Sequence, residues 1–410
     1  MKSNFRRSFL ILFLLMPALF NGHPVRAQSA IELENVSASV QFGEQVTFVA
    51  TVRAAIPIQE VAIVILDESQ GITHIERLNL QSDGRAEYRY DTRRNALRPF
   101  SRVSWNYRFT LPDGNTVYSE VFSVRYTDER FPWQTLESGS LQINWYNGDA
   151  QFGQSAWNAL DAGLESVSRL LPVDAARPVE FYLYGNVDDL RGTLSAGSRD
   201  WIAGHADPSL GVVMVAIEPG PQQDLLMQQR IPHELMHIMM YRAVGEGYPN
   251  IPAWLREGAA VLAEVAPNLE YERVFREAVT RQDWIPLSSL CGSFPADAGR
   301  AFLAYAASRS FTGYLHELYG SSGLLTLAQA YASGADCERG PEIAVGVSLS
   351  KLERDWHASV GGQNDLMPAL QNMVPYLVLL CLVLVVPAFG ILVSMRRKGA
   401  SRGPETRIRK

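Results

Sequence analysis

The sequence predicts a multidomain protein with an N-terminal antiparallel β-sandwich, a following α+β domain and one transmembrane helix near the C-terminus. Three observations predict this order. Hydrophobic and polar residues alternate over 28–128, a few strand-like runs give way to long helical patterns over 139–361, and residues 373–395 carry no charge. These patterns are typical of half-buried strands, of a small sheet followed by helices, and of a membrane span.

The first 27 residues have the features of a signal peptide, which we expect to be removed. Three basic residues precede an apolar run over 9–20, and "PVRA" ends at Ala27 in the small-residue pattern of a cleavage site. Arg6 and Arg7 also resemble a twin-arginine signal, although Phe5 stands where Ser or Thr is usual. The general secretory route is favoured, and the twin-arginine route stays open.

Residues 28–128 are predicted to form an immunoglobulin-like sandwich of about seven short strands. One face of "VTFVATV" (46–52) and one face of "VSWNYRF" (103–109) are apolar, and "SDG" and "LPDGN" supply turns between such runs. No residue in this segment indicates a ligand. A spacer role is therefore favoured over a docking role.

Residues 126–140 interrupt the alternation with charges and a proline, and we take them as the join between two domains. Beyond it, "SAWNALDAGLESVSRLL" (155–171) has helical spacing, whereas "PVEFYLYGN" (178–186) and "GVVMVAIEP" (211–219) are strand-like. From residue 222 the pattern is almost entirely helical. The sequence therefore predicts an α+β domain over 139–361.

The stretch "RIPHELMHIMMY" (230–241) is the strongest candidate for chemistry. Successive residues of a helix are about 100° apart, so His233, Glu234 and His237 share one side of a helix. Two imidazoles one turn apart suit a single Zn²⁺ ion, and the neighbouring carboxylate can reach a water molecule on it. Pro232 requires either that the helix begins there or that an earlier helix is kinked there.

A third metal ligand is expected in "IPAWLREGAAVLAE" (251–264). Glu257 lies twenty residues after His237 on the next predicted helix, and two histidines with one glutamate are an established zinc set. Glu264 lies seven residues further, on the same helix face. It is expected to accept a hydrogen bond from His233 or His237 and so orient that ring.

With these residues the chain resembles the gluzincin metallopeptidases, which have a peptidase-MA-like (thermolysin-type) catalytic domain. The resemblance depends on "HELMH", the interval to Glu257, "WLREGAA" and the later "YAASRSFTGYL", and it covers roughly residues 140–361. It implies a zincin-like fold, a peptide or protein substrate, zinc ligands at His233, His237 and Glu257, and a general base at Glu234. By the same likeness, Tyr305 is the candidate donor to the oxyanion.

The chain departs from some members of that family. Aminopeptidases in it hold the substrate's free amine with an acidic strand, whereas "WIAGHADPSLGVVMVAI" (201–217) offers no evident acidic anchor. The choice between endopeptidase and exopeptidase therefore stays open. His205 in this stretch could line the substrate strand, and His316 is expected to be structural because Gly320 stands where a second histidine would be needed.

Residues 373–395, "MVPYLVLLCLVLVVPAFGILVSM", are long enough to cross a hydrocarbon core as a helix. Residues 396–410 carry seven basic residues and one acid, so the positive-inside rule predicts that this tail is cytoplasmic. We therefore expect a single-pass type I protein of the cell membrane, with residues 28–372 outside the cytoplasm.

Charge and cysteine content exclude two other classes of protein. The net charge is −6 although both ends are basic, so the part between them is acidic, which argues against a nucleic-acid partner. Three cysteines are too few for a disulfide scaffold, and Cys381 lies in the predicted span. Cys291 and Cys337 are left, and their spacing is compatible with a bridge or with two free thiols.

Two functions are compatible with these features. The favoured one is a membrane-anchored, extracytoplasmic zinc metallopeptidase. The alternative is a non-catalytic cell-surface binding protein built on a gluzincin-like domain. An intramembrane zinc protease is rejected, because Arg230, Arg242 and Glu246 surround the histidine motif.

Overall fold

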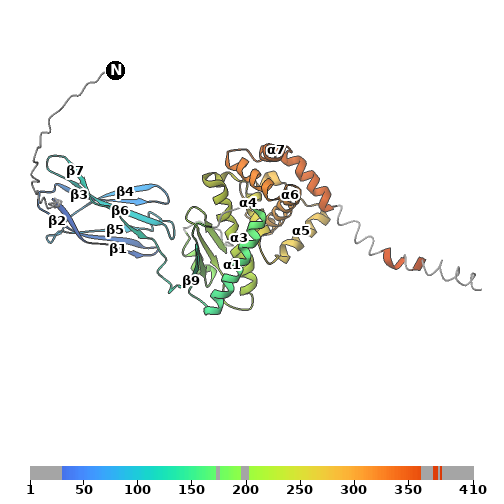
Figure 1. The fold of residues 1–410 in the computed structure, drawn as a ribbon, viewed down its shortest axis with the longest axis horizontal. Helices are drawn as coiled ribbons and strands as arrows, with labels where there is room; N and C mark the ends of the chain where they lie inside the picture. The colour runs from blue at the N-terminus through green and yellow to red at the C-terminus, as the bar shows by residue number, and fades with distance from the viewer. Residues whose placement is uncertain (1–29, 172–175, 195–202, 362–372, 377–378, 381–410) are drawn as a thin grey trace, which may run out of the picture. The chain divides into compact units, whose positions relative to one another are not determined.

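The structure, a computed structural model, describes residues 30–171, 176–194, 203–361, 373–376 and 379–380. The chain divides into two compact units (Figure 1). Unit 1 comprises Met1–Asn95 and Val103–Val124, and unit 2 comprises Ala96–Arg102 and Arg125–Lys410. A seven-residue segment of unit 2 is therefore inserted between parts of unit 1, and the expected boundaries at 28–128 and 139–361 stay predictions.

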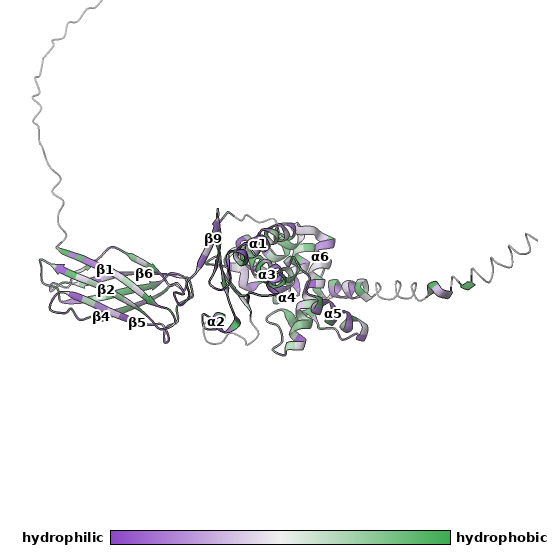
Figure 2. Cartoon of the chain, turned by 90° about the horizontal axis from the view of Figure 1, so that it is seen from below, coloured by the Kyte–Doolittle hydropathy of each residue, from purple (hydrophilic) through white to green (hydrophobic). Residues whose placement is uncertain are grey.

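Unit 1 consists of two antiparallel sheets. The first has the order β1-β2-β5, and the second has the order β4-β3-β6-β7 with β8 also paired to β6. The strands are β1 (Ile31–Gln41), β2 (Gln45–Ala54), β3 (Glu60–Asp67), β4 (Ile72–Leu78), β5 (Arg85–Asp91), β6 (Arg102–Thr110), β7 (Thr116–Tyr118) and β8 (Phe122–Arg125). Hydrophilic and hydrophobic residues are mixed along these strands (Figure 2).

The two sheets of unit 1 pack through their apolar faces. The ring centroids of Phe48 on β2 and Trp105 on β6 are 5.0 Å apart, and both side chains are buried. Every second residue of β2 from Val46 to Val52 is buried, as the alternation predicts. The β-rich N-terminal region is confirmed, and its immunoglobulin-like character stays a prediction.

Unit 2 contains a mixed sheet of the order β12-β13-β11-β10-β9. Its central strands β10 (Leu141–Trp145), β11 (Val179–Tyr184) and β13 (Val212–Ala216) are parallel, whereas β9 (Gln134–Ser138) and β12 (Gly204–Asp207) lie antiparallel at the edges. The central strands are mostly apolar because both faces of the sheet are covered, and their polar residues are Gln142, Asn144 and Glu180. One face packs on α1 and α3, and the other packs on Phe100, Leu190 and neighbouring aromatic residues.

Helices make up most of unit 2 after the sheet, as the sequence predicts. They are α1 (Ala150–Leu170), α2 (Val187–Arg191), α3 (Gln223–Val244), α4 (Ala253–Ala263), α5 (Leu269–Arg281), α6 (Ala298–Ala332) and α7 (Arg339–Val345), with short 3₁₀ helices η1 (Gly245–Asn250) and η2 (Leu287–Leu290). Residues 349–361 are also helical. The α+β character of this part of the chain is confirmed.

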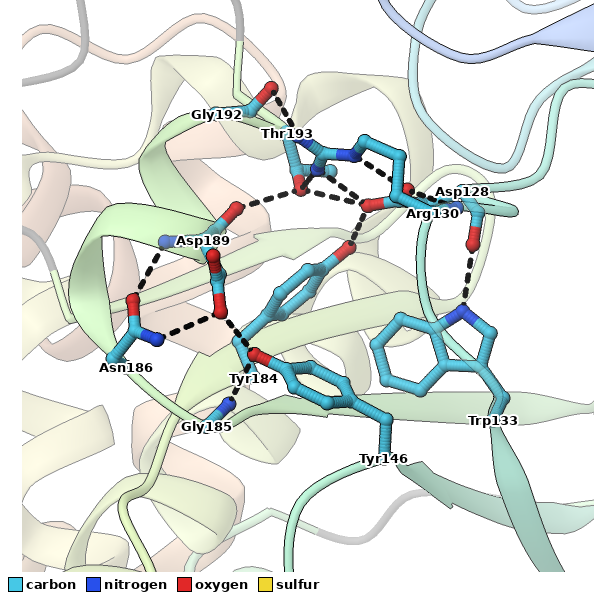
Figure 3. Close-up of polar contacts among 10 residues, drawn as sticks. All are labelled: Asp128, Arg130, Trp133, Tyr146, Tyr184, Gly185, Asn186, Asp189, Gly192 and Thr193. Atoms are coloured by element: carbon cyan, nitrogen blue, oxygen red, sulfur yellow. Dashed lines mark hydrogen bonds and ion pairs between the residues drawn. The ribbon is translucent and has the colours of Figure 1, made fainter.

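The segment expected to join two domains is packed on the sheet of unit 2. The buried carboxylate of Asp128 accepts hydrogen bonds from Arg130, Tyr184 and Thr193, with donor–acceptor distances of 2.6–3.0 Å (Figure 3). The Trp133 indole N–H donates to the Asp128 carbonyl at 2.7 Å. Because buried charges are costly unless paired, this network fixes residues 128–133 to unit 2.

Cys291 and Cys337 form a disulfide bond with a sequence separation of 46 residues. The Cys291 carbonyl also accepts a hydrogen bond from the Ala253 N–H at the start of α4. The bridge therefore connects the segment before α6 to the segment before α7, next to the beginning of α4. The sequence alone could not decide between the bridged and free forms.

The predicted transmembrane helix at 373–395 is wrong. A helix needs about 20 apolar residues to cross a bilayer, and no helix among the described residues is both long and apolar enough. Within that segment the structure describes helix only at 373–376 and 379–380, and the remainder lies outside the described residues. The expected placement as a single-pass type I cell-membrane protein depended on this helix and is corrected with it. The predicted signal peptide (1–27) and basic tail (396–410) also lie outside the described residues.

Candidate metal centre

The helix that carries the two histidines runs through Pro232 without ending there. Helix α3 begins at Gln223, so Pro232 lies inside it. Proline has no N–H to donate to the carbonyl four residues earlier, which here belongs to Gln228. That carbonyl instead accepts from the Val265 N–H at 2.9 Å. The missing helical bond is thus replaced by one that connects α3 to the end of α4.

Helices α3 and α4 bring three potential metal ligands together. Glu257 Oε2 lies 3.5 Å from His233 Nε2 and 3.7 Å from His237 Nε2, and the three ligand atoms all lie within 4.8 Å of one another. Tetrahedral zinc with ligand bonds of about 2.1 Å places neighbouring ligand atoms about 3.4 Å apart. The donor set and its spacing therefore fit a zinc ion.

The other ring nitrogen of each histidine also has a partner. His233 Nδ1 lies 3.1 Å from Glu264 Oε1, and His237 Nδ1 lies 2.9 Å from the Tyr248 hydroxyl on η1. Partners of this kind fix the ring orientation and leave Nε2 free for a metal. Glu264 was expected at this place from the sequence. Tyr248 was not, because η1 has no periodicity that indicates where its side chains point.

The part of the chain that carries these residues matches a known family. Residues 159–362 match the family model of the Peptidase MA superfamily. This part of the chain is a peptidase-MA-like domain. No curated protein matches the chain.

Some solved structures share limited regions with the chain. They include the catalytically inactive OgpA from Akkermansia muciniphila in complex with an O-glycopeptide substrate (16% identity, TM-score 0.19, covering 23% of this chain and 28% of that one). A second is a polysaccharide deacetylase from Bacillus cereus (10% identity, TM-score 0.20, 42% and 57% covered). The chain thus spans less than two thirds of either protein, and at these TM-scores the likenesses carry no argument about fold or activity.

The two acidic residues of the peptidase-MA-like domain's centre differ in electrostatic state. Burial raises the pKa of Glu234 to about 7. Burial opposes ionisation of Glu257 as well, but the charge of His237 and the hydrogen bond with His233 outweigh it and lower its pKa to about 2. Glu257 is therefore a permanent anion suited to holding a cation, whereas Glu234 can exchange a proton near neutral pH.

The pKa values of the two histidines also shift in opposite directions. Burial opposes the charged form of His233, yet hydrogen bonds with Glu257 and Glu264 raise its pKa to about 10. Burial lowers the pKa of His237 to about 4. Metal ligands must be deprotonated, so a zinc ion would replace the proton that the carboxylates hold on His233.

The edge strand β12 approaches the candidate base closely. A Cβ atom built on Gly204 would overlap Glu234 Oε1. Only glycine leaves room for the carboxylate at this point of the strand. Gly204 therefore allows Glu234 to lie between the strand and the metal-binding residues, a role that the sequence analysis did not foresee.

A cavity of about 390 Å³ opens beside these groups. Its lining includes His205 on β12 and Tyr305 on α6 as well as His233, Glu234 and Glu257. The ring centroids of Tyr305 and His233 are 6.4 Å apart. Tyr305 and His205 are thus both placed at the candidate site.

His316 is not placed at this cavity. Its Nε2 lies 3.3 Å from the hydroxyl of Ser321, further along α6.

Proposed function

We propose that the peptidase-MA-like domain is a zinc-dependent peptidase of the gluzincin type. The observation that carries this proposal is the convergence of His233, His237 and Glu257 from two helices, with Glu234 beside them. A glutamate third ligand on the following helix is the feature that the gluzincins share. Peptide or protein is the corresponding substrate class.

In the proposed mechanism each residue has a separate task. Zinc, when bound to His233, His237 and Glu257, would supply an acidified water and polarise the substrate carbonyl. Glu234 accepts the proton of the attacking water and returns it to the leaving amine. Tyr305 donates a hydrogen bond to the oxygen on which negative charge develops.

Other side chains keep these groups in place. Glu264 and Tyr248 hold the imidazoles of His233 and His237 through their Nδ1 atoms. Among the described residues, β12 has a sheet neighbour on one side only. The backbone of an edge strand can pair with an extended peptide, which would bring a substrate past Glu234.

Metal analysis and an activity assay on the full chain test the proposal. We expect about one zinc per chain, hydrolysis of a casein-like substrate, loss of hydrolysis with a chelator, and recovery when zinc is added back. A folded protein that binds no zinc would contradict the proposal and favour the alternative, a non-catalytic binding protein built on a gluzincin-like domain.

A further inference from the structure

A second cavity adjoins the candidate metal centre. It has a volume of about 440 Å³ and is lined by residues of α3, α5 and α6. Gly204, His233, Glu234 and Tyr305 line both this cavity and the first one. Because the two cavities share these residues, a peptide held at the metal centre would extend from one into the other.

One positively charged side chain lines the second cavity. Arg230 lies on α3 one turn before His233, lines this cavity and is half buried. Its Nη1 atom donates to the Ala216 carbonyl at the end of β13. Among the described residues no carboxylate lies within ion-pair distance of it. Burial lowers its pKa, and the negative charge of Glu234 offsets that effect only in part. A partly desolvated guanidinium with further N–H donors is suited to bind an anion.

The carboxylates of Glu234 and Glu264 also line the second cavity, and both lie next to the metal-binding residues. Glu264 accepts from His233 Nδ1, and Glu234 lines the first cavity as well. The rings of Tyr271 and Phe302 supply apolar walls. An ion pair is stronger against such walls than in water, because the effective dielectric constant is lower.

We infer that Arg230 binds a carboxylate of the peptide substrate in the second cavity. This inference rests on the proposed peptidase function and names its substrate class. The carboxylate has two possible sources in a peptide, the side chain of Glu or Asp beside the scissile bond and the C-terminus. A purely structural role, in which Arg230 only caps the Ala216 carbonyl, is the competing explanation.

The experiment first identifies a cleavage site and then removes one carboxylate at a time from peptides around that site. The zinc-loaded full chain is incubated with a tryptic peptide mixture, and the cut positions are identified by mass spectrometry. Matched synthetic peptides around one such site then carry Glu or Gln at the flanking position, each with a free or an amidated C-terminus. We expect kcat/KM to be about 10- to 100-fold higher for the peptides that keep the recognised carboxylate.

The two sources give different patterns. A Glu over Gln preference that survives amidation identifies the side chain, and cleavage that requires a free C-terminus identifies the terminal carboxylate. Either pattern supports the inference. Zinc-dependent cleavage with no preference among the four peptides overturns it while leaving the proposed function intact. Absence of any zinc-dependent cleavage overturns both.

Variants separate recognition from folding. In Arg230→Gln the preference ratio should fall to about 1, and in Arg230→Lys, which keeps the charge, part of it should return. Arg281→Gln, at the exposed end of α5, is the matched control and should keep the wild-type ratio. Zinc content and melting temperature verify that each variant is folded. A ratio unchanged in a folded Arg230→Gln protein would leave only the structural role.

Discussion

At the scale of the residue, the candidate centre shows how position determines the chemistry of one side chain type. Glu234, Glu257 and Glu264 are chemically identical, yet one is poised near neutral pH, one is held ionised and one bonds a ring nitrogen. The difference comes from burial and from the distance to the two imidazoles. Substitutions at these positions should therefore have different consequences.

Glu234→Gln should keep zinc and lose hydrolysis, because an amide cannot accept the proton and Glu234 is not among the three ligands. We expect a loss of about 10²- to 10⁴-fold in kcat. Glu257→Ala should lose both zinc and hydrolysis. Plasma mass spectrometry of the dialysed variants, together with initial rates, checks both. Undiminished zinc in Glu257→Ala would refute its assignment as a ligand.

Gly204→Ala should reduce activity without removing zinc, because its Cβ would displace the Glu234 carboxylate and not the ligands. Misplacement of a catalytic group by about 1 Å can cost about 100-fold in rate. The measurement is kcat together with zinc content. Gly313→Ala on α6, where the nearest atom lies 3.8 Å from the added Cβ, is the control and should behave like wild type. Equal activity in the two variants would show that Gly204 makes no such room.

At the scale of the element, the arrangement of α3 and α4 depends on one feature that the sequence predicts and on one contact that it does not. The spacing of His233, His237 and Glu257 predicts two neighbouring helices, and the structure has them. The hydrogen bond from Val265 to the Gln228 carbonyl could not be predicted, because it depends on a long-range approach that helical periodicity does not encode. For the same reason Tyr248 and Arg230 were not recognised as parts of the site.

Reduction of the Cys291–Cys337 bond should destabilise the fold more than the metal centre. Closing a loop of 46 residues stabilises a protein by about 4 kcal/mol in the chain-entropy model. We expect the urea midpoint to fall by the corresponding amount in reductant, with zinc still bound at low urea. The double variant Cys291→Ser with Cys337→Ser should have the same midpoint with and without reductant. If the wild-type protein is equally insensitive to reductant, the bridge does not contribute.

At the scale of the whole molecule, the sequence did not predict which segments of the chain make up unit 2. The alternation of residues 28–128 correctly predicted strands, but the inserted segment Ala96–Arg102 belongs to unit 2. Phe100 in it stacks on Tyr182 at 3.7 Å between ring centroids, and Arg98 pairs with Asp207 at 3.1 Å. Local periodicity cannot indicate such a contact, because the partners are far apart in the chain.

A fragment of residues 139–361 should therefore be less stable than the same region in the full chain. It lacks Phe100, Asp128 and Arg130, so the hydroxyls of Tyr184 and Thr193 lose the carboxylate that accepts their hydrogen bonds. Leaving a buried polar group without its hydrogen-bond partner costs about 1–3 kcal/mol. Thermal unfolding should show a lower midpoint for 139–361 than for 125–361, which retains Asp128. Equal midpoints would show that the network adds no stability.

The inserted segment also affects the order in which the protein can assemble on the ribosome. Phe100 is synthesised about 80 residues before Tyr182, on which it stacks, and at about 5–20 residues per second its partner is made roughly 4–16 s later. During that interval β5 and β6, on either side of Phe100, can pair with β2 and β3, which are synthesised before them, while the Phe100 ring has no Tyr182 to pack on. The nascent chain therefore exposes an apolar side chain in the loop between β5 and β6, which is the kind of surface that a chaperone binds.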